Sequence, residues 1–371
     1  MTLIKMLDLQ RQYLAIKPEI DAVVHSVLDS TEFIQGKAVR KFEANLGTYL
    51  GARFVVGCAS GTDALQVALR ALGIEPGDEV ITTPFTFAAA TETIALLGAR
   101  PVYVDIEPRT YNLDVSQIAR RLTPRTKAIL PVHLYGHPAD MRPLLTLARE
   151  KGLKVIEDMA QAVGAKYEGR FAGTLGDIGC LSFYPTKNLG AYGDGGALVC
   201  SDEALAQRCR MICDHGSRIK YEHEILGFNS RLDSLQAAIL TVKLAYLEGW
   251  TESRIRIAQR YGEGLRGLNL TLPETTANVR HVFHQYTIRL PRRESLATYL
   301  KEKGIGSAVH YPIPLHQQPA FRSFVAADDR FPEAEAASRE ILCLPIYPEL
   351  EDSEVEAVMA AIRGFFERLP L

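Results

Sequence analysis

The chemistry that this sequence offers begins with one lysine. Residues 180–184 form a short apolar run that predicts a buried strand, and the Pro-Thr-Lys-Asn sequence of residues 185–188 is typical of a turn. Lys187 therefore follows a buried strand among apolar neighbours, and loss of water around an amine lowers a lysine pKa. A neutral lysine amine can form a Schiff base with a carbonyl. Most lysines in such a place are ordinary surface residues, so the function of Lys187 depends on other stretches.

A carboxylate and an anion site are predicted elsewhere in the chain. Asp158 follows the apolar strand predicted at residues 153–156, and Gln161 comes three positions later. Residues 60–63 (Ser-Gly-Thr-Asp) join a predicted strand to a predicted helix, where backbone N–H groups and the helix dipole favour an anion. Each of these residues has an ordinary alternative role as a helix N-cap. Thr62 or Asp63 could cap the helix that follows residues 60–63, and Asp158 could cap the segment that follows it.

These residues together fit a pyridoxal phosphate site. That cofactor needs a lysine for its aldehyde, a carboxylate beside its pyridine nitrogen and a cradle for its phosphate. Lys187 meets the first need and Asp158 the second, while the amide of Gln161 can reach the phenolic oxygen. The phosphate ligands are then Gly61, Thr62 and Ser182.

The elements that must position these residues alternate along the first 213 residues. We expect strands at residues 54–59, 78–82, 101–105, 127–131, 153–156 and 197–200, and helices at 64–72, 87–97, 141–151 and 203–213. Apolar strands separated by helices predict an α/β fold with a mostly parallel sheet flanked by helices. Ligands of such sheets bind beyond the carboxyl ends of the strands, where Asp158 and Lys187 both fall.

The remaining segments suggest a second, smaller domain. Helices are expected at residues 18–28, 39–50 and 231–247, the last continuing after Gly249 to about 265, and residues 215–229 are predicted to be a long loop. The C-terminal part holds predicted strands at 286–290 and 306–310 and helices at 294–303 and from 332 and 353. We therefore predict a large domain over residues 1–248 and a small α+β domain over residues 249–371.

Composition excludes several classes of protein. The net charge of -2 argues against a nucleic-acid partner, and no apolar run is long enough to span a membrane. The six cysteines form no CxxC pair and lie mostly in apolar runs, so we expect reduced packing residues in a cytoplasmic protein without a metal site.

Five motifs, taken together, resemble the DegT/StrS family of nucleotide-sugar aminotransferases. They are residues 59–65 (ASGTDAL), 157–162 (EDMAQA), 182–190 (SFYPTKNLG), 193–196 (GDGG) and 229–233 with 235–238 (NSRLD, LQAA). The resemblance covers nearly the whole chain and implies fold type I, the fold of the aspartate aminotransferase group. Met159 departs from the small residue that is more usual in the second motif.

The resemblance also implies roles for individual residues. Lys187 is the Schiff-base lysine and the base that moves a proton, and Asp158 and Gln161 face the pyridine nitrogen and ring hydroxyl. Phe87 matches the aromatic residue that stacks on the ring, with Phe85 as the alternative. Asn229 matches a residue that reaches the phosphate from the other subunit, so the resemblance implies a homodimer with shared active sites.

The implied substrates are L-glutamate, which leaves as 2-oxoglutarate, and a nucleotide-linked keto sugar. Residues 215–223 and 307–316 are similar to the branch that aminates carbon 3, with amination of carbon 4 as the alternative. The implied sugars are a thymidine-linked 3-keto-6-deoxyhexose and a uridine-linked 3-keto-N-acetylglucosamine uronate. Residues expected to meet the substrate are Tyr184, Lys220, His310 and Tyr311. A non-catalytic regulator and a lyase on the same scaffold are the weaker alternatives.

Overall fold

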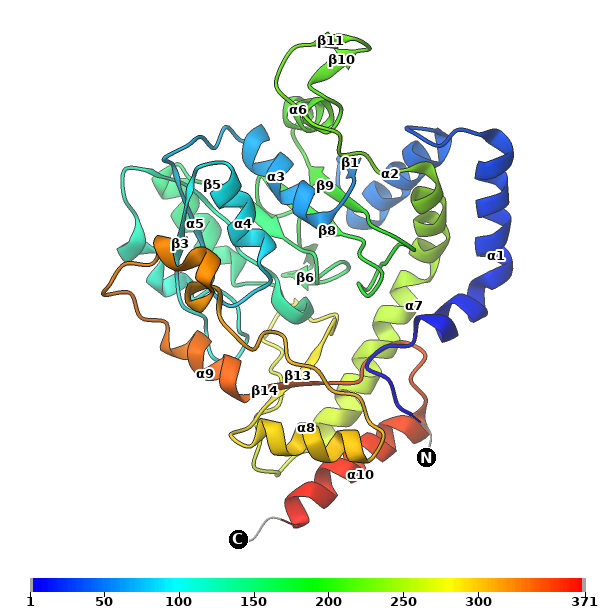
Figure 1. The fold of residues 1–371 in the computed structure, drawn as a ribbon, viewed down its shortest axis with the longest axis vertical. Coiled ribbons are helices and arrows are strands. Elements are labelled where there is room, and N and C mark those ends of the chain that lie inside the picture. Colours follow the sequence, from blue (N-terminus) through cyan, green and yellow to red (C-terminus); the bar gives the residue numbers. More distant parts are fainter. Residues whose placement is uncertain (1–2, 369–371) are drawn as a thin grey trace.

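The computed structural model describes residues 3–368, and its central element is a seven-stranded sheet (Figure 1). The strands follow the order β1-β9-β8-β5-β4-β2-β3, and only β9 runs against the others. Their bounds are β1 (Phe54–Cys58), β2 (Glu79–Thr82), β3 (Arg100–Tyr103), β4 (Thr126–Ile129), β5 (Lys154–Asp158), β8 (Ile178–Ser182) and β9 (Gly196–Cys200). The prediction of a mostly parallel sheet is confirmed.

Helices cover both faces of this sheet. One face packs against α3 (Gly61–Ala71), α4 (Ala89–Leu96) and α6 (Glu203–Cys213). The opposite face packs against α2 (Lys37–Leu50), α5 (Met141–Lys151) and the first half of α7 (Ser234–Gly264), and α1 (Leu9–Ser30) lies outside α7 (Figure 1). Since both faces are covered, the strands are buried along their length, as their apolar runs predict.

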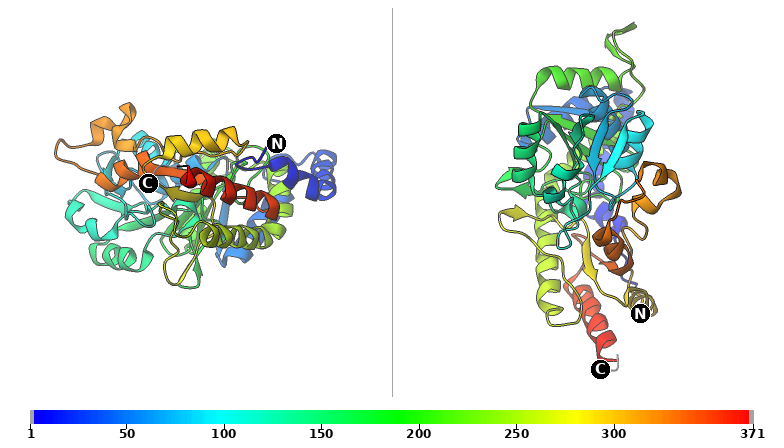
Figure 2. Two further views of the ribbon diagram at one scale, coloured as in Figure 1. Left: turned by 90° about the horizontal axis from the view of Figure 1, so that it is seen from below. Right: turned by 90° about the vertical axis from the view of Figure 1, so that its left-hand side faces the viewer.

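A second core lies at the other end of the molecule, around the last third of the chain (Figures 1 and 2). It joins the antiparallel pair β13 (Tyr286–Arg289) and β14 (Ile341–Leu344) to α8 (Arg293–Glu302), α10 (Asp352–Glu367) and the second half of α7. α9 (Pro332–Glu340) lies between the two cores and packs on the first. Helix α7 runs unbroken across residues 248–249, so the domain boundary placed there remains a prediction.

Three predicted elements are wrong in the structure. Pro18 does not open the first helix but lies inside α1. Residues 215–229 are not only a loop: they contain the hairpin of β10 (Ser217–Ile219) and β11 (Glu222–His223), which projects beyond α6 (Figure 1). Residues 306–310 form no strand: Ala308 makes a single bridge to Cys343. Cys343 lies in β14, a strand that was not predicted from the sequence. A small sheet of β6 (Lys166–Tyr167), β7 (Arg170–Phe171) and β12 (Val279–Arg280) completes the strands.

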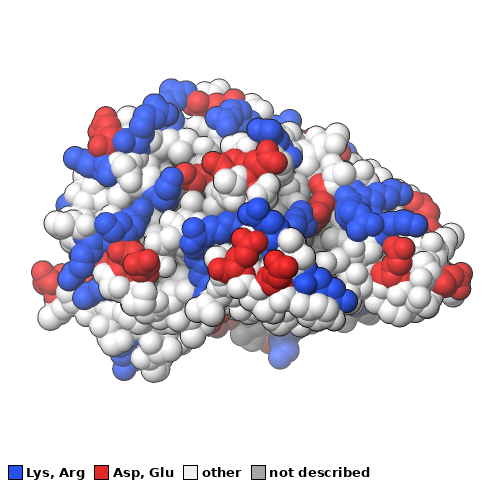
Figure 3. Space-filling model, turned by 90° about the horizontal axis from the view of Figure 1, so that it is seen from above, with Lys and Arg blue, Asp and Glu red and all other residues white. Residues whose placement is uncertain are grey.

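Other features of the described chain concern its environment. All six cysteines are buried and unpaired, in agreement with a packing role. Among residues 3–368, no helix has the length and apolar character needed to cross a bilayer, and no cluster of three His, Cys, Asp or Glu side chains is arranged to bind a metal. Seen over α6 and the hairpin, basic and acidic side chains are interspersed on the surface (Figure 3).

Candidate active site

Lys187 lies in a tight turn just beyond β8. Its N–H donates to the carbonyl of Tyr184 at 2.8 Å, and the N–H of Ala191 donates to the carbonyl of Phe183 at 2.7 Å, so the turn closes on itself. Burial lowers the pKa of the Lys187 amine, and the negative charge of Asp158 opposes that shift. The lysine therefore has the environment of a nucleophile whose neutral form is accessible.

Side chains from other parts of the chain hold this turn in place. Asn188 Nδ2 donates to the carbonyl of Val282 at 3.2 Å, which leaves Asn188 Oδ1 to accept from His284 Nδ1 at 3.0 Å. Lys243, from α7, donates to the carbonyl of Gly190, further along the same turn. These contacts fix the backbone that follows Lys187.

Asp158 ends β5, the strand that pairs with β8, so the lysine and the carboxylate come from neighbouring strands. The Asp158 carboxyl is 7% exposed, and its Oδ1 accepts from the N–H of Ala160 at 3.0 Å. Burial raises the Asp158 pKa, whereas the nearby charge of Lys187 lowers it. A cationic ring nitrogen at this place would favour the charged carboxylate.

Gly61 and Ser182 form a cradle between α3 and β8. A Cβ on Gly61 would lie 2.5 Å from Ser182 Cβ, so only glycine lets the first turn of α3 approach the strand end. Ser60 is the N-cap of α3, because its side chain accepts from the N–H of Asp63 at 3.0 Å; the alternative of a cap by Thr62 or Asp63 is wrong. The N–H groups of this first turn face the cradle with the positive end of the helix dipole, which suits a phosphate.

Aromatic and polar groups line the mouth of the site. Phe85 is fully buried, whereas Phe87 is 57% exposed and its ring lies 6.2 Å from that of Tyr311. The two rings line one open pocket together with residues 312–321. Because Phe85 is buried, Phe87 remains the predicted ring-stacking residue. Gln161 Nε2 donates to Tyr311 Oη at 3.3 Å, and His310 precedes Tyr311 in the same segment, where burial and the charge of Lys187 lower the His310 pKa.

Three predicted site residues lie apart from this cluster or at its edge. Tyr184 belongs to the Lys187 turn through its carbonyl, and the residue is 53% exposed. Lys220 lies at the exposed tip of the β10–β11 hairpin with its Nζ over the ring of Tyr221. Asn229 pairs with Asp214 at the base of the same hairpin. Among the described residues, neither Lys220 nor Asn229 hydrogen-bonds to Lys187, Asp158 or Ser182.

Two residues that support the cluster around Lys187 were not predicted from the sequence. Tyr135 donates its N–H to Gln161 Oε1 at 2.7 Å, and His284 orients Asn188. Each is remote in sequence from the residue it contacts. The sequence gives little sign of such a contact, apart from the place of the tyrosine and the histidine beside predicted strands.

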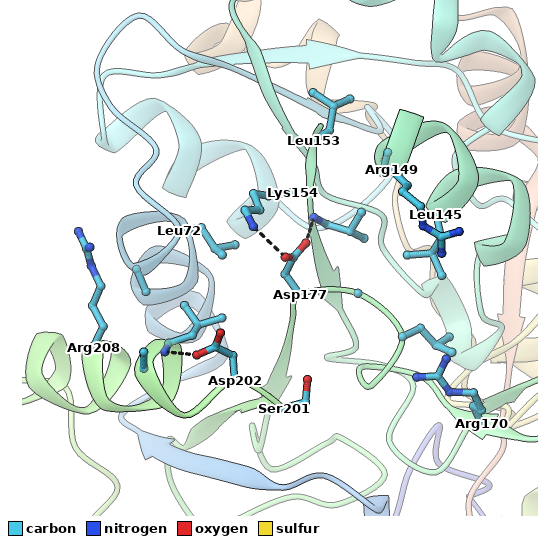
Figure 4. Close-up of a pocket in the computed structure, with 17 residues that line it drawn as sticks. Leu72, Leu145, Arg149, Leu153, Lys154, Arg170, Asp177, Ser201, Asp202 and Arg208 are labelled. Carbon is cyan, nitrogen blue, oxygen red and sulfur yellow. Dashed lines mark hydrogen bonds and ion pairs between the residues drawn. The ribbon is translucent and has the colours of Figure 1, made fainter. Parts of the chain in front are cut away.

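Another pocket lies elsewhere, at the opposite end of the parallel strands. It surrounds the start of β5, where Lys154 pairs with Asp177 at 3.2 Å, and the residues that follow β9 (Figure 4). Because ligands of such sheets bind at the carboxyl ends of the strands, we place the chemistry at Lys187 instead.

Comparison with known proteins gives a consistent answer. The family model described as DegT/DnrJ/EryC1/StrS aminotransferase matches residues 14–363. Curated relatives include a "Pleiotropic regulatory protein" of Geobacillus stearothermophilus, 50% identical over 98% of both chains. Another, from Acidithiobacillus ferrooxidans, is named as the 3-aminotransferase of UDP-N-acetyl-3-dehydro-alpha-D-glucosamine and is 47% identical over 98% of both chains.

Solved structures agree in fold over the whole chain. DesV of S. venezuelae has a TM-score of 0.98 at 44% identity, with full coverage of both chains. NtdA of Bacillus subtilis, solved with bound PMP, has a TM-score of 0.93 at 35% identity and covers 99% of this chain and 86% of its own. The chain is therefore an aminotransferase with fold type I architecture, and it belongs to the DegT/DnrJ/EryC1/StrS family.

Proposed function

We propose that this protein transfers an amino group from L-glutamate to carbon 3 of a nucleotide-linked 3-keto sugar, with pyridoxal phosphate as its cofactor. The observation that carries the proposal is the placement of an amine and a carboxylate at the ends of neighbouring strands, Lys187 after β8 and Asp158 at the end of β5. Burial lowers the pKa of the Lys187 amine and raises that of the Asp158 carboxyl. The binding of PMP, the aminated form of the cofactor, by NtdA supports the choice of cofactor.

The residues of the site fit the cofactor group by group. The Gly61–Ser182 cradle, with Thr62 in the first turn of α3, would hold the phosphate. Asp158 would keep the pyridine nitrogen protonated, and the Nε2 group of Gln161 would donate to the phenolic oxygen. Phe87 would stack on the ring from the open side.

The bound cofactor would supply an electron sink for the carbanion at the amino-bearing carbon. Lys187 would then carry the proton between carbon atoms, and its lowered pKa favours the neutral form that a base requires. Asp158 would hold the positive charge in place on the ring nitrogen. The apolar walls around the Lys187 turn, such as Phe183 and Leu189, would limit the access of water.

The name of the Acidithiobacillus relative supports carbon 3, as do residues 215–223 and 307–316. We expect Tyr184, His310 and Tyr311 to meet the sugar or its diphosphate. The uridine-linked 3-keto-N-acetylglucosamine of that relative joins the thymidine-linked 6-deoxyhexose and the uridine-linked uronate as candidate acceptors.

The β10–β11 hairpin supports a homodimer with shared sites. It projects from the molecule with Tyr221 81% exposed at its tip and Leu226 88% exposed after it, and such exposed hydrophobic side chains favour burial against a second copy. We infer that Lys220 and Asn229 act in the site of the partner subunit. The six unpaired cysteines favour a reducing compartment, so we infer a cytoplasmic location.

The name of the Geobacillus relative favours one other function, that of a regulator. A purely regulatory role would not require Lys187, Asp158 and the Gly61–Ser182 cradle, all of which are in place. Purified protein loaded with the cofactor and mixed with glutamate should yield one 2-oxoglutarate per subunit. The aminated enzyme is then offered 3-keto and 4-keto nucleotide sugars, and NMR of the product locates the new amine. A nitrogen on carbon 3 supports the proposal, and amination only at carbon 4, or no 2-oxoglutarate, overturns it.

A further inference from the structure

Tyr135 lies at the junction of the large domain and the His310–Tyr311 segment. It is 3% exposed and sits in the short turn Leu134–Gly136 that follows β4. Its φ of 59° is in the left-handed region, which costs about 1–2 kcal/mol for a residue with a side chain. Such a conformation persists where the surroundings fix it, so the contacts of Tyr135 are informative.

The backbone of Tyr135 orients Gln161. The Tyr135 N–H donates to Gln161 Oε1 at 2.7 Å, so the carbonyl oxygen of that amide must face the turn and the NH2 group must face the opposite way. On that side, Gln161 Nε2 donates to Tyr311 Oη at 3.3 Å. Gln161 Nε2 carries a second hydrogen, and one donor therefore remains for a ligand of the site.

The side chain of Tyr135 holds the other segment. Its hydroxyl donates to the backbone carbonyl of His310, the residue before Tyr311. Burial raises the Tyr135 pKa well above its ordinary value, so the hydroxyl keeps its proton and remains a donor. The contacts close a ring, from Tyr135 N–H through Gln161 and Tyr311 to the His310 carbonyl and back to the Tyr135 hydroxyl.

We propose that Tyr135 is a positioning residue that fixes, through this one ring of hydrogen bonds, both the amide of Gln161 and the His310–Tyr311 segment. The assignment of Gln161 to the cofactor and of His310 and Tyr311 to the sugar rests on the proposed function. The ring of hydrogen bonds itself is a property of the fold. Removal of the Tyr135 hydroxyl should free the His310 end and leave the backbone contact to Gln161 intact.

The test variant is Tyr135→Phe, and the matched control is Tyr111→Phe. Tyr111 packs its ring edge-on against that of Tyr135 with centroids 5.7 Å apart, and it is also buried, but it lies outside the hydrogen-bonded ring. The first readout needs no cofactor or substrate: hydrogen–deuterium exchange of the peptide around His310 and Tyr311 in the cofactor-free protein. We expect several-fold faster exchange there in Tyr135→Phe only.

The second readout is the split between KM and kcat in the holoenzyme. In Tyr135→Phe we expect the KM of the nucleotide sugar to rise about five- to tenfold, the range for one lost hydrogen bond, with kcat within about threefold of the wild-type value. Unchanged exchange and unchanged KM would overturn the proposal, as would equal effects in Tyr111→Phe. If no nucleotide sugar is aminated, the proposed function fails, and the exchange readout still decides the role of Tyr135.

Discussion

The Cβ that Gly61 lacks would lie 2.5 Å from the Cβ of Ser182, closer than side chains pack. This approach brings the first turn of α3 onto the end of β8, the strand that leads to Lys187. The absence of a side chain at Gly61 thus allows the helix N-terminus to lie beside the strand that leads to the Lys187 turn.

Gly61→Ala should separate these two elements. We expect the free energy of unfolding to fall by about 1–3 kcal/mol and the cofactor to bind more weakly, because either α3 or Ser182 must move. Urea unfolding and equilibrium dialysis measure the two effects. Gly249→Ala is the matched control: no atom lies within 4 Å of its added Cβ, so the variant should gain about 1 kcal/mol from helix propensity. If Gly61→Ala binds the cofactor as tightly as the wild type, the Gly61–Ser182 cradle does not hold the phosphate.

Asp158→Asn should lower the pKa of Lys187 further, because the Asp158 charge is the attraction that opposes the effect of burial. The pH dependence of chemical labelling of Lys187 in the cofactor-free protein, read by mass spectrometry, measures that shift. We also expect glutamate conversion to slow by about 100-fold or more, the scale for removal of one charge-stabilising group. Asp177→Asn alters a carboxylate at the opposite end of the parallel strands, where it pairs with Lys154, and should leave the labelling of Lys187 unchanged. If wild type, Asp158→Asn and Asp177→Asn have the same labelling curve, the charge of Asp158 does not act on the Lys187 amine.

Glu157 is the side chain beside Asp158 that points the other way, into a fully buried network. Its carboxylate contacts His133 Nε2 at 2.9 Å and accepts the N–H groups of residues 173, 175 and 176 at 2.6–2.8 Å. Glu157→Gln puts an NH2 group against these donors, so we expect a loss of about 3–5 kcal/mol in unfolding free energy. Glu224→Gln removes a partner from an exposed ion pair 3.7 Å long and should change stability by less than about 1 kcal/mol. Similar stabilities for the two variants would refute the structural role of Glu157.

Stability should fall with acid because His137 is buried. Burial lowers the pKa of His137 to about 4 from an ordinary value of 6.5. Between these two values the unfolded chain binds a proton that the folded chain does not, so each pH unit below 6.5 should cost about 1.4 kcal/mol, down to pH 4. Urea unfolding of wild type and His137→Gln between pH 7 and 4 measures this slope, which the variant should reduce. His25→Gln, at an exposed position, should keep the wild-type slope; an unchanged slope in His137→Gln would count against the account.

The sequence predicted the central sheet well because most of its strands are short apolar runs bounded by helices or turns. Helices α5 and α6 begin and end where their periodicity predicts. Asp158 and Lys187 were expected to share a site for the same reason, since both follow buried strands, and the strands prove to be neighbours.

The failures have local causes. Pro18 is tolerated inside α1 because Leu14, whose carbonyl loses its helical partner, is 58% exposed and open to water. The β10–β11 hairpin is exposed and has no buried face, so no alternation of apolar and polar residues marks it. The contact of Tyr135 with Gln161 joins residues 26 positions apart through a backbone N–H, which no side-chain pattern reveals.

The central claim is that Lys187 is the lysine that binds the cofactor. A second lysine, Lys243, also has a lowered pKa and could react instead, so the test must distinguish the two. Lys243 is 1% exposed, and burial lowers its pKa to about 8. Borohydride reduction of the protein loaded with pyridoxal phosphate, followed by peptide mass spectrometry, locates the attached group. The account predicts one modified peptide, which contains Lys187, and none in Lys187→Ala. Attachment at Lys243, or unchanged attachment in Lys187→Ala, would contradict it.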